Sequence, residues 1–154
     1  TLLRPLLDAT HAQLVALVAD AGLQAVDDPA NSSSRFDRTA ARALLATTPW
    51  VDPARLAASA QHLAQAEAAL DWAASLTWDS RVEAKADVLW LDVAGLPDEI
   101  TRRVLLRGLR ALNPDATPRG PDVERLMAAC AAGNTVTLAG VQARGGGRWR
   151  LRRL

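Results

Sequence analysis

Two groups of charged residues in this sequence have types and spacings suited to binding phosphate groups. The first runs from Asp28-Pro29-Ala30-Asn31 to Arg35, Arg38 and Arg42. Arg38 and Arg42 are four residues apart, so on a helix both guanidinium groups face the same way, beside a loop that offers an Asp and an Asn. Such an edge can bind phosphate through charge-assisted hydrogen bonds. Alternatively, Asp28 and Asn31 cap the following helix or bind these arginines internally, and spacing alone leaves both interpretations open.

The second group is the basic C-terminal end of the chain, with Arg144 and a further run from Arg148 to Arg153. In a strand, Arg148, Arg150 and Arg152 would line one face, while Trp149, Leu151 and Arg153 would take the other. Such a cationic ladder could track a phosphate backbone. The alternative is a charged, solvated face that discourages pairing at a sheet edge.

A third set of arginines belongs to the helix predicted after Leu96-Pro97-Asp98. Arg103, Arg107 and Arg110 recur at spacings of four and three, so they share one face of that helix. We expect this face to lie near the C-terminal ladder and to extend its basic surface.

Catalytic signals are weak by comparison. Gly145–Gly147 lead into a predicted strand rather than into a helix N-terminus, so we interpret them as a flexible turn and not as a phosphate-binding loop. His11 and His62 are expected to be exposed on helices, and Cys130 is expected to pack on an apolar helix face. One Cys and two His argue against a disulfide framework and a zinc site. We therefore predict no catalytic residue and no metal in this chain.

Composition and charge narrow the class of protein. The 154 residues are 49% hydrophobic and 23% charged, which is typical of about one folded domain. No apolar run approaches the ~18 residues of a membrane span. Together with the lone Cys, and with a start at Thr1 that lacks Met and a leader, this predicts part of a longer, cytoplasmic protein with no membrane partner.

The net charge of +1 conceals two halves of opposite sign. Residues 1–98 hold 7 basic and 13 acidic side chains, a net of −6, whereas residues 99–154 hold 11 basic and 4 acidic side chains, a net of +7. A strongly basic half indicates a polyanionic partner such as a nucleic acid.

The elements that must position these residues are mostly helical. Apolar periodicity, caps and breakers predict helices over residues 10–21, 37–46, 52–76, 97–113 and 121–131. Alternation predicts strands over 82–90, 135–138, 141–144 and 148–154. The predicted fold class is α+β and predominantly helical: a helical N-terminal segment and a long connecting helix, followed by a small domain of helices packed on an antiparallel sheet.

Three leucines, Leu56, Leu63 and Leu70, recur every seven residues in the long helix. Three heptad positions are too few to indicate a coiled coil, so we expect these leucines to pack on a neighbouring element. Self-association through this helix is the alternative, which leaves a dimer open.

The ordered motifs of this chain resemble the tRNA(Ile)-lysidine synthases over essentially its whole length. Arg4-Pro5-Leu6-Leu7 is similar to the Arg-Pro-Leu-Leu segment of that family. The next block is similar to its Gly-Leu, Asp-Pro-Ser-Asn and Phe-x-Arg-x-x-x-Arg pattern at Gly22-Leu23, Asp28–Asn31, Phe36, Arg38, Arg42 and Leu44-Leu45. A less specific block, similar to the family's accessory domain, follows at Leu96-Pro97, Arg102-Arg103 and Thr137–Gly140. Departures occur at His11, Ala25, Ser33 and Thr39, where the family often has Arg, Trp, Asp and Asn.

The resemblance implies a cytoplasmic, ATP-dependent carbon–nitrogen ligase. Such an enzyme adenylates the wobble cytidine of an isoleucine tRNA and then attaches lysine to form lysidine. By the same resemblance, residues 1–49 are the tail of the nucleotide-binding catalytic domain, 50–79 a long connecting helix and 80–154 an accessory tRNA-recognition domain. This sequence lacks the family's Ser-Gly-Gly-x-Asp-Ser loop. We therefore expect ATP with Mg to bind to a preceding domain, and this fragment alone to be inactive.

The resemblance also implies which residues bind tRNA(Ile) or border the catalytic cleft: Arg4, Asp28, Asn31, Arg35, Arg38, Arg42, Arg103, Arg107, Arg110, Arg144, Arg148, Arg150 and Arg152. Two other classes remain open. A related tRNA thiolation enzyme would usually carry cysteine pairs, whereas Cys130 is alone. A non-enzymatic module for RNA binding or self-association is the second.

Overall fold

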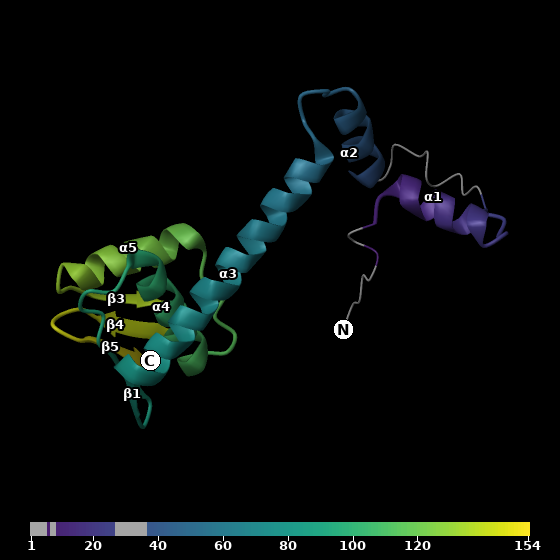
Figure 1. The fold of residues 1–154 in the computed structure, drawn as a ribbon. Coiled ribbons are helices and arrows are strands. Elements are labelled where there is room, and N and C mark those ends of the chain that lie inside the picture. The colour runs from purple at the N-terminus through teal and green to yellow at the C-terminus, as the bar shows by residue number, and fades with distance from the viewer. Residues whose placement is uncertain (1–5, 7–8, 27–36) are drawn as a thin grey trace. The chain divides into compact units, whose positions relative to one another are not determined.

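The chain divides into two compact units, residues 1–56 and 57–154 (Figure 1). The computed structural model describes residues 6, 9–26 and 37–154. The first unit contains α1 (His11–Asp20) and α2 (Asp37–Ala46). Thr10 caps α1, because its hydroxyl accepts a hydrogen bond from the backbone N–H of Gln13 and the Gln13 side chain accepts one from the backbone N–H of Thr10. Both helices confirm the prediction.

The long helix α3 (Pro53–Arg81) begins at the predicted position but continues beyond the predicted end near Leu76. Its start follows from local chemistry, since Asp52 Oδ1 accepts a hydrogen bond from the Ala54 N–H at 2.9 Å and Pro53 occupies the first turn. No Gly or Pro interrupts residues 77–81 to end the helix earlier.

The heptad leucines of α3 have different environments. Leu56 and Leu63 are 53% and 71% exposed, whereas Leu70 packs against the core of the second unit. The expectation that all three pack on a neighbouring element is therefore confirmed for Leu70 alone.

The second unit is built on a five-stranded antiparallel sheet in the order β1-β2-β5-β4-β3. The strands are β1 (Val82–Lys85), β2 (Val88–Leu91), β3 (Thr135–Leu138), β4 (Val141–Arg144) and β5 (Trp149–Arg153). Helices α4 (Asp98–Leu112) and α5 (Gly120–Ala131) pack against it (Figure 1). This arrangement confirms the predicted α+β, predominantly helical class.

Residues 82–90, predicted as a single strand, instead form the β1–β2 hairpin. Lys85 pairs with Val88 across a two-residue turn, in which Ala86 has a left-handed φ of 49°. The turn shifts the alternation by one residue, so Val88 and Trp90 lie on the face opposite to Val82. Alternation alone could not show this shift, because Ala86 is not a typical residue for a left-handed turn.

The core of the second unit lies between the helices and one face of the sheet. The predicted apolar stripe of α4 is largely confirmed, because its members Ile100, Val104, Leu105 and Leu109 are at most 6% exposed. They meet a sheet face whose side chains are also buried: Leu89, Leu91, Val141, Ala143, Trp149 and Leu151. At Gly108 the helix approaches the sheet closely, since an added Cβ would lie 3.4 Å from Leu151.

Gly145 is required by close packing rather than by flexibility of the turn. Its N–H donates a hydrogen bond to the carbonyl of Asn134 at 2.9 Å. An added Cβ would lie 1.8 Å from the carbonyl oxygen of Cys130. The connection from β4 to β5 therefore packs directly on the last turn of α5.

Candidate nucleic-acid interface

One face of the sheet carries exposed, basic side chains, and we call it the outer sheet face. Alternation in β5 turns Trp149 and Leu151 into the core, so Arg150 and Arg152 point outward as predicted. Pairing between the strands places further residues on the same face: Glu83, Lys85, Val88, Trp90, Gln142 and Arg144.

Strand pairing brings the residues of this face into rows. Arg150 is the register partner of both Trp90 and Arg144, and Arg152 is the partner of Gln142. Neighbouring strands lie about 4.8 Å apart, so Arg144 of β4 and Arg150 of β5 become adjacent in space, beside Trp90 of β2. The outer sheet face is therefore a continuous basic surface and not an isolated strand of arginines.

The arginines of this region differ in how they are held. The Arg150 guanidinium lies 5.8 Å from the centroid of the Trp90 ring, and Arg152 donates to Gln142 Oε1 at 3.4 Å. Arg148, just before β5, forms an ion pair with Glu83 at 3.3 Å. Arg144 is exposed and forms no ion pair within the described part of the chain. Phosphate binding by Arg148 would compete with Glu83, whereas Arg144, Arg150 and Arg152 have no carboxylate partner among the described residues.

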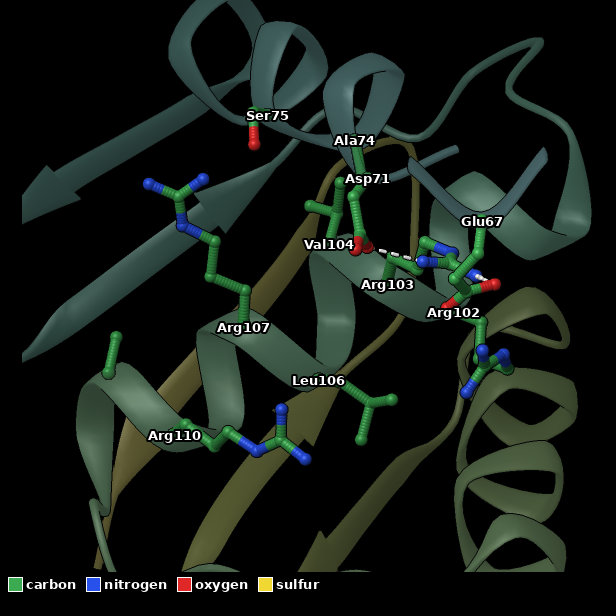
Figure 2. A pocket seen from close by; sticks show the side chains of 11 residues that line it. Glu67, Asp71, Ala74, Ser75, Arg102, Arg103, Val104, Leu106, Arg107 and Arg110 are labelled. Carbon is green, nitrogen blue, oxygen red and sulfur yellow. Dashed lines mark hydrogen bonds and ion pairs between the residues drawn. The ribbon is translucent and has the colours of Figure 1, made fainter. Parts of the chain in front are cut away.

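Arg103, on α4, joins two helices. Its side chain is 11% exposed and contacts Glu67 at 2.7 Å and Asp71 (Figure 2). It also contacts Glu99 at 2.7 Å. Glu67 and Asp71 lie on α3, so this cluster connects α3 to α4. The three carboxylates raise the pKa of Arg103 and occupy its donors, which favours a structural role over contact with phosphate.

Arg107 and Arg110 are among the residues that line an open hollow between α3 and α4, with a volume of about 790 Å³ (Figure 2). The Arg107 guanidinium lies 4.5 Å from the centroid of the Trp78 ring. Arg110 is exposed at the rim.

The structure does not bring this α4 set together with the outer sheet face. Because α4 turns its apolar stripe toward the sheet, arginines at the opposite helical positions must point away from it. No described sheet residue lines the hollow at α4. The two basic surfaces are therefore separate.

The predicted site residues that precede α3, which we call the N-terminal set, are described only in part. Arg4, Asp28, Asn31 and Arg35 lie outside the described residues. Arg38 and Arg42 are exposed and lie one turn apart on α2, as their spacing predicted. Their predicted place beside a catalytic cleft stays a prediction.

The Cys and His side chains that the structure describes lie apart from the basic surfaces. Burial raises the pKa of the Cys130 thiol to about 11, so the thiol is protonated at neutral pH. His11 and His62 are exposed on helices, as expected. Among residues 6, 9–26 and 37–154, no three His, Cys, Asp or Glu side chains form a group that could hold a metal ion. Over the same residues, no helix has both the length and the apolar character needed to cross a bilayer.

Sequence reasoning missed Trp90 as a member of the basic surface. The alternation placed it on one face of a single strand, and the hairpin turn moved it to the other. Its pairing with Arg150 depends on contact between residues 60 positions apart, which no local pattern of residues indicates.

The contribution of the Glu99 carboxylate on α4 to the stability of the fold depends on pH. Hydrogen bonds from Arg102 and Arg103 lower its pKa to about 2 from an ordinary value of 4.5. Ionised Glu99 therefore stabilises the folded state fully above about pH 4.5, and this contribution is lost as the pH falls toward 2. Because the side chain is 37% exposed, solvent screening limits its contribution to about 1 kcal/mol.

We expect Glu99→Gln to lower the free energy of unfolding at pH 7 and to flatten its decline between pH 4.5 and 2. Urea denaturation across this range measures both effects. Glu124→Gln is the matched control, since Glu124 is exposed on α5 and forms no ion pair with a described residue. Equal acid profiles for Glu99→Gln and the unchanged chain would contradict the assignment.

The fold and its surfaces define a class of protein with a helical N-terminal segment followed by a small α+β domain that carries an arginine-rich sheet face. No family model matches the chain. Its sequence is 37% identical over 152 residues to the tRNA(Ile)-lysidine synthase of Zymomonas mobilis, and 44% identical over 154 residues to that of Novosphingobium aromaticivorans. Each comparison covers 99% of this chain, but only 46% and 47% of the two relatives.

A third relative, the tRNA(Ile)-lysidine synthase of a Methylobacterium species, is 40% identical over 80% of this chain and 38% of its own length. The chain is thus homologous to the tRNA(Ile)-lysidine synthases, which confirms the resemblance in its motifs. It spans about half the length of the curated relatives that it matches.

Proposed function

We propose that this chain is the part of a tRNA(Ile)-lysidine synthase that follows the nucleotide-binding loop, and that it binds and positions the tRNA. The homology supports membership in such an enzyme. The outer sheet face carries the binding proposal, because it aligns Arg144, Arg150 and Arg152 on adjacent strands with no carboxylate partner among the described residues. Arginine donors in this arrangement suit phosphate oxygens.

In the parent ligase, ATP would adenylate the wobble cytidine of an isoleucine tRNA with release of pyrophosphate, and the amine of lysine would then displace AMP to leave lysidine. This sequence has no Ser-Gly-Gly-x-Asp-Ser loop, the segment to which the resemblance assigns nucleotide binding. We therefore assign nucleotide binding to another part of the enzyme. We also propose that this chain has no ligase activity by itself. The site of action is the cytoplasm, where tRNA is available.

Within the chain, we propose three parts. Residues 1–49 would be the C-terminal tail of the catalytic domain, residues 50–79 the helix that connects it to the next domain, and residues 80–154 the domain that recognises tRNA. The N-terminal set, which includes Arg38 and Arg42 on α2, would border the catalytic cleft. Arg107 and Arg110 would supply a second contact with tRNA, separate from the outer sheet face.

Binding of a fluorescently labelled isoleucine tRNA to the 154-residue chain, followed by anisotropy at several salt concentrations, tests this proposal. We expect saturable binding that weakens steeply with salt, because each phosphate contact releases condensed counterions. Sedimentation velocity of the free chain separates this result from self-association through α3. A chain that associates with itself but does not bind tRNA would overturn the proposal.

A further inference from the structure

A small hollow lies on the outer sheet face where β2, β5 and the end of β4 meet. Its volume is about 140 Å³, and it is lined by Trp90, Arg144, Gly145, Arg148 and Arg150. Strand register fixes its centre, since Arg150 pairs with Trp90 on one side and with Arg144 on the other. The hollow therefore combines one aromatic ring with cations from two strands and the connection between them.

The polar side chains of this hollow can donate hydrogen bonds but cannot accept them. A guanidinium has no acceptor, and the indole nitrogen of Trp90 is a donor only. Glu83, the register partner of Trp90, does not line the hollow, and its carboxylate forms an ion pair with Arg148 at 3.3 Å. A matching ligand must bring acceptor atoms and negative charge.

The Trp90 ring adds a second requirement. The Arg150 guanidinium lies over this ring, 5.8 Å from its centroid, so a flat ligand would stack on the guanidinium or take its place over the ring. Nucleobases stack on both kinds of surface, and a nucleotide also brings the phosphate oxygens that arginines bind. Bases within a duplex are already stacked on one another and cannot reach the ring.

We propose that this hollow binds one unpaired nucleotide of the tRNA, with its base stacked on Trp90 and its phosphate bound by Arg144 and Arg150. This inference rests on the proposed function, because it assigns the type of RNA element that the outer sheet face recognises. It distinguishes this face from the α4 surface, where the Arg107 guanidinium lies 4.5 Å from the centroid of the Trp78 ring, closer than Arg150 lies to that of Trp90 at 5.8 Å.

The test compares the 154-residue chain with its Trp90→Leu and Trp90→Phe variants. The probes are a short oligouridylate and a blunt RNA duplex of about ten base pairs. We expect Trp90→Leu to weaken oligouridylate binding by about 10-fold, with little change for the duplex, because stacking contributes only with an exposed base. The salt dependence should stay unchanged, because no charge is removed. Trp90→Phe should retain most of the affinity.

Val88→Ala is the matched control, since Val88 lies on the same strand and the same face but offers no ring. Quenching of tryptophan fluorescence by oligouridylate gives a second measurement that does not depend on Trp90→Leu folding. This quenching should largely disappear in Trp90→Phe.

Two results would overturn this inference while leaving the proposed function intact. One is tRNA binding with unchanged oligouridylate affinity in a folded Trp90→Leu variant, and the other is full quenching in Trp90→Phe. Failure of the unchanged chain to bind tRNA would instead remove the proposed function, and this inference with it.

Discussion

Replacing Arg144, Arg150 and Arg152 together by Gln is expected to weaken tRNA binding by about 100-fold and to lower the salt slope by about two to three. These guanidinium groups lie on the outer sheet face without carboxylate partners among the described residues, so phosphate does not have to displace a competing anion. Each lost contact should remove about one unit of slope. Anisotropy titrations with labelled tRNA at several salt concentrations measure affinity and slope together.

A control with the same loss of charge is available elsewhere on the chain. Arg55, Arg119 and Arg125 are exposed and lie outside the outer sheet face. Their joint replacement by Gln should change the affinity only slightly, because long-range charge effects are screened at physiological salt. Equal losses in the two triple variants would show that net charge, and not this face, determines binding.

Arg148 is expected to contribute less than its neighbours. Its ion pair with Glu83 must be given up or shared when phosphate binds. The sequence placed Arg148, Arg150 and Arg152 in one equivalent ladder, whereas the structure separates Arg148 from the other two and adds Arg144 from the adjacent strand.

Elements that depend on local chemistry could be predicted from the sequence. The capping box at Thr10, the Asp52-Pro53 start and the apolar stripe of α4 involve residues within a few positions of one another. These signals act through backbone hydrogen bonds and helical periodicity, which a single segment contains in full. The bounds of α2 and the strands from Thr135 onward followed for the same reason.

Features that depend on distant contacts could not be predicted in this way. Arg103 was expected to face tRNA, but Glu67 and Asp71, more than 30 residues earlier, engage its guanidinium. Likewise, the face on which Trp90 lies depends on a turn at Ala86 whose left-handed φ the residue type does not favour. Helical spacing identifies which side chains share a face, but not what lies opposite that face.

Gly145→Ala is expected to destabilise the second unit by about 3 kcal/mol, a loss at the upper end of ordinary single substitutions. The added Cβ would lie 1.8 Å from the carbonyl oxygen of Cys130 and 2.5 Å from its carbonyl carbon. Both are backbone atoms at the end of α5, so no side-chain rotation can relieve the contact. Either α5 or the connection between β4 and β5 must move, which would also strain the hydrogen bond from Gly145 to Asn134.

Thermal unfolding measures this effect, with a fall in Tm of about 10 to 20 °C expected for a unit of this size. Gly147→Ala is the control, because a Cβ at Gly147 meets no atom within 4 Å. Its stability should change by no more than about 0.5 kcal/mol. If the two variants were equally stable, the glycine run would serve flexibility, as the sequence first indicated. A selective loss in Gly145→Ala would show that the connection between Arg144 and Arg148 depends on close packing against α5.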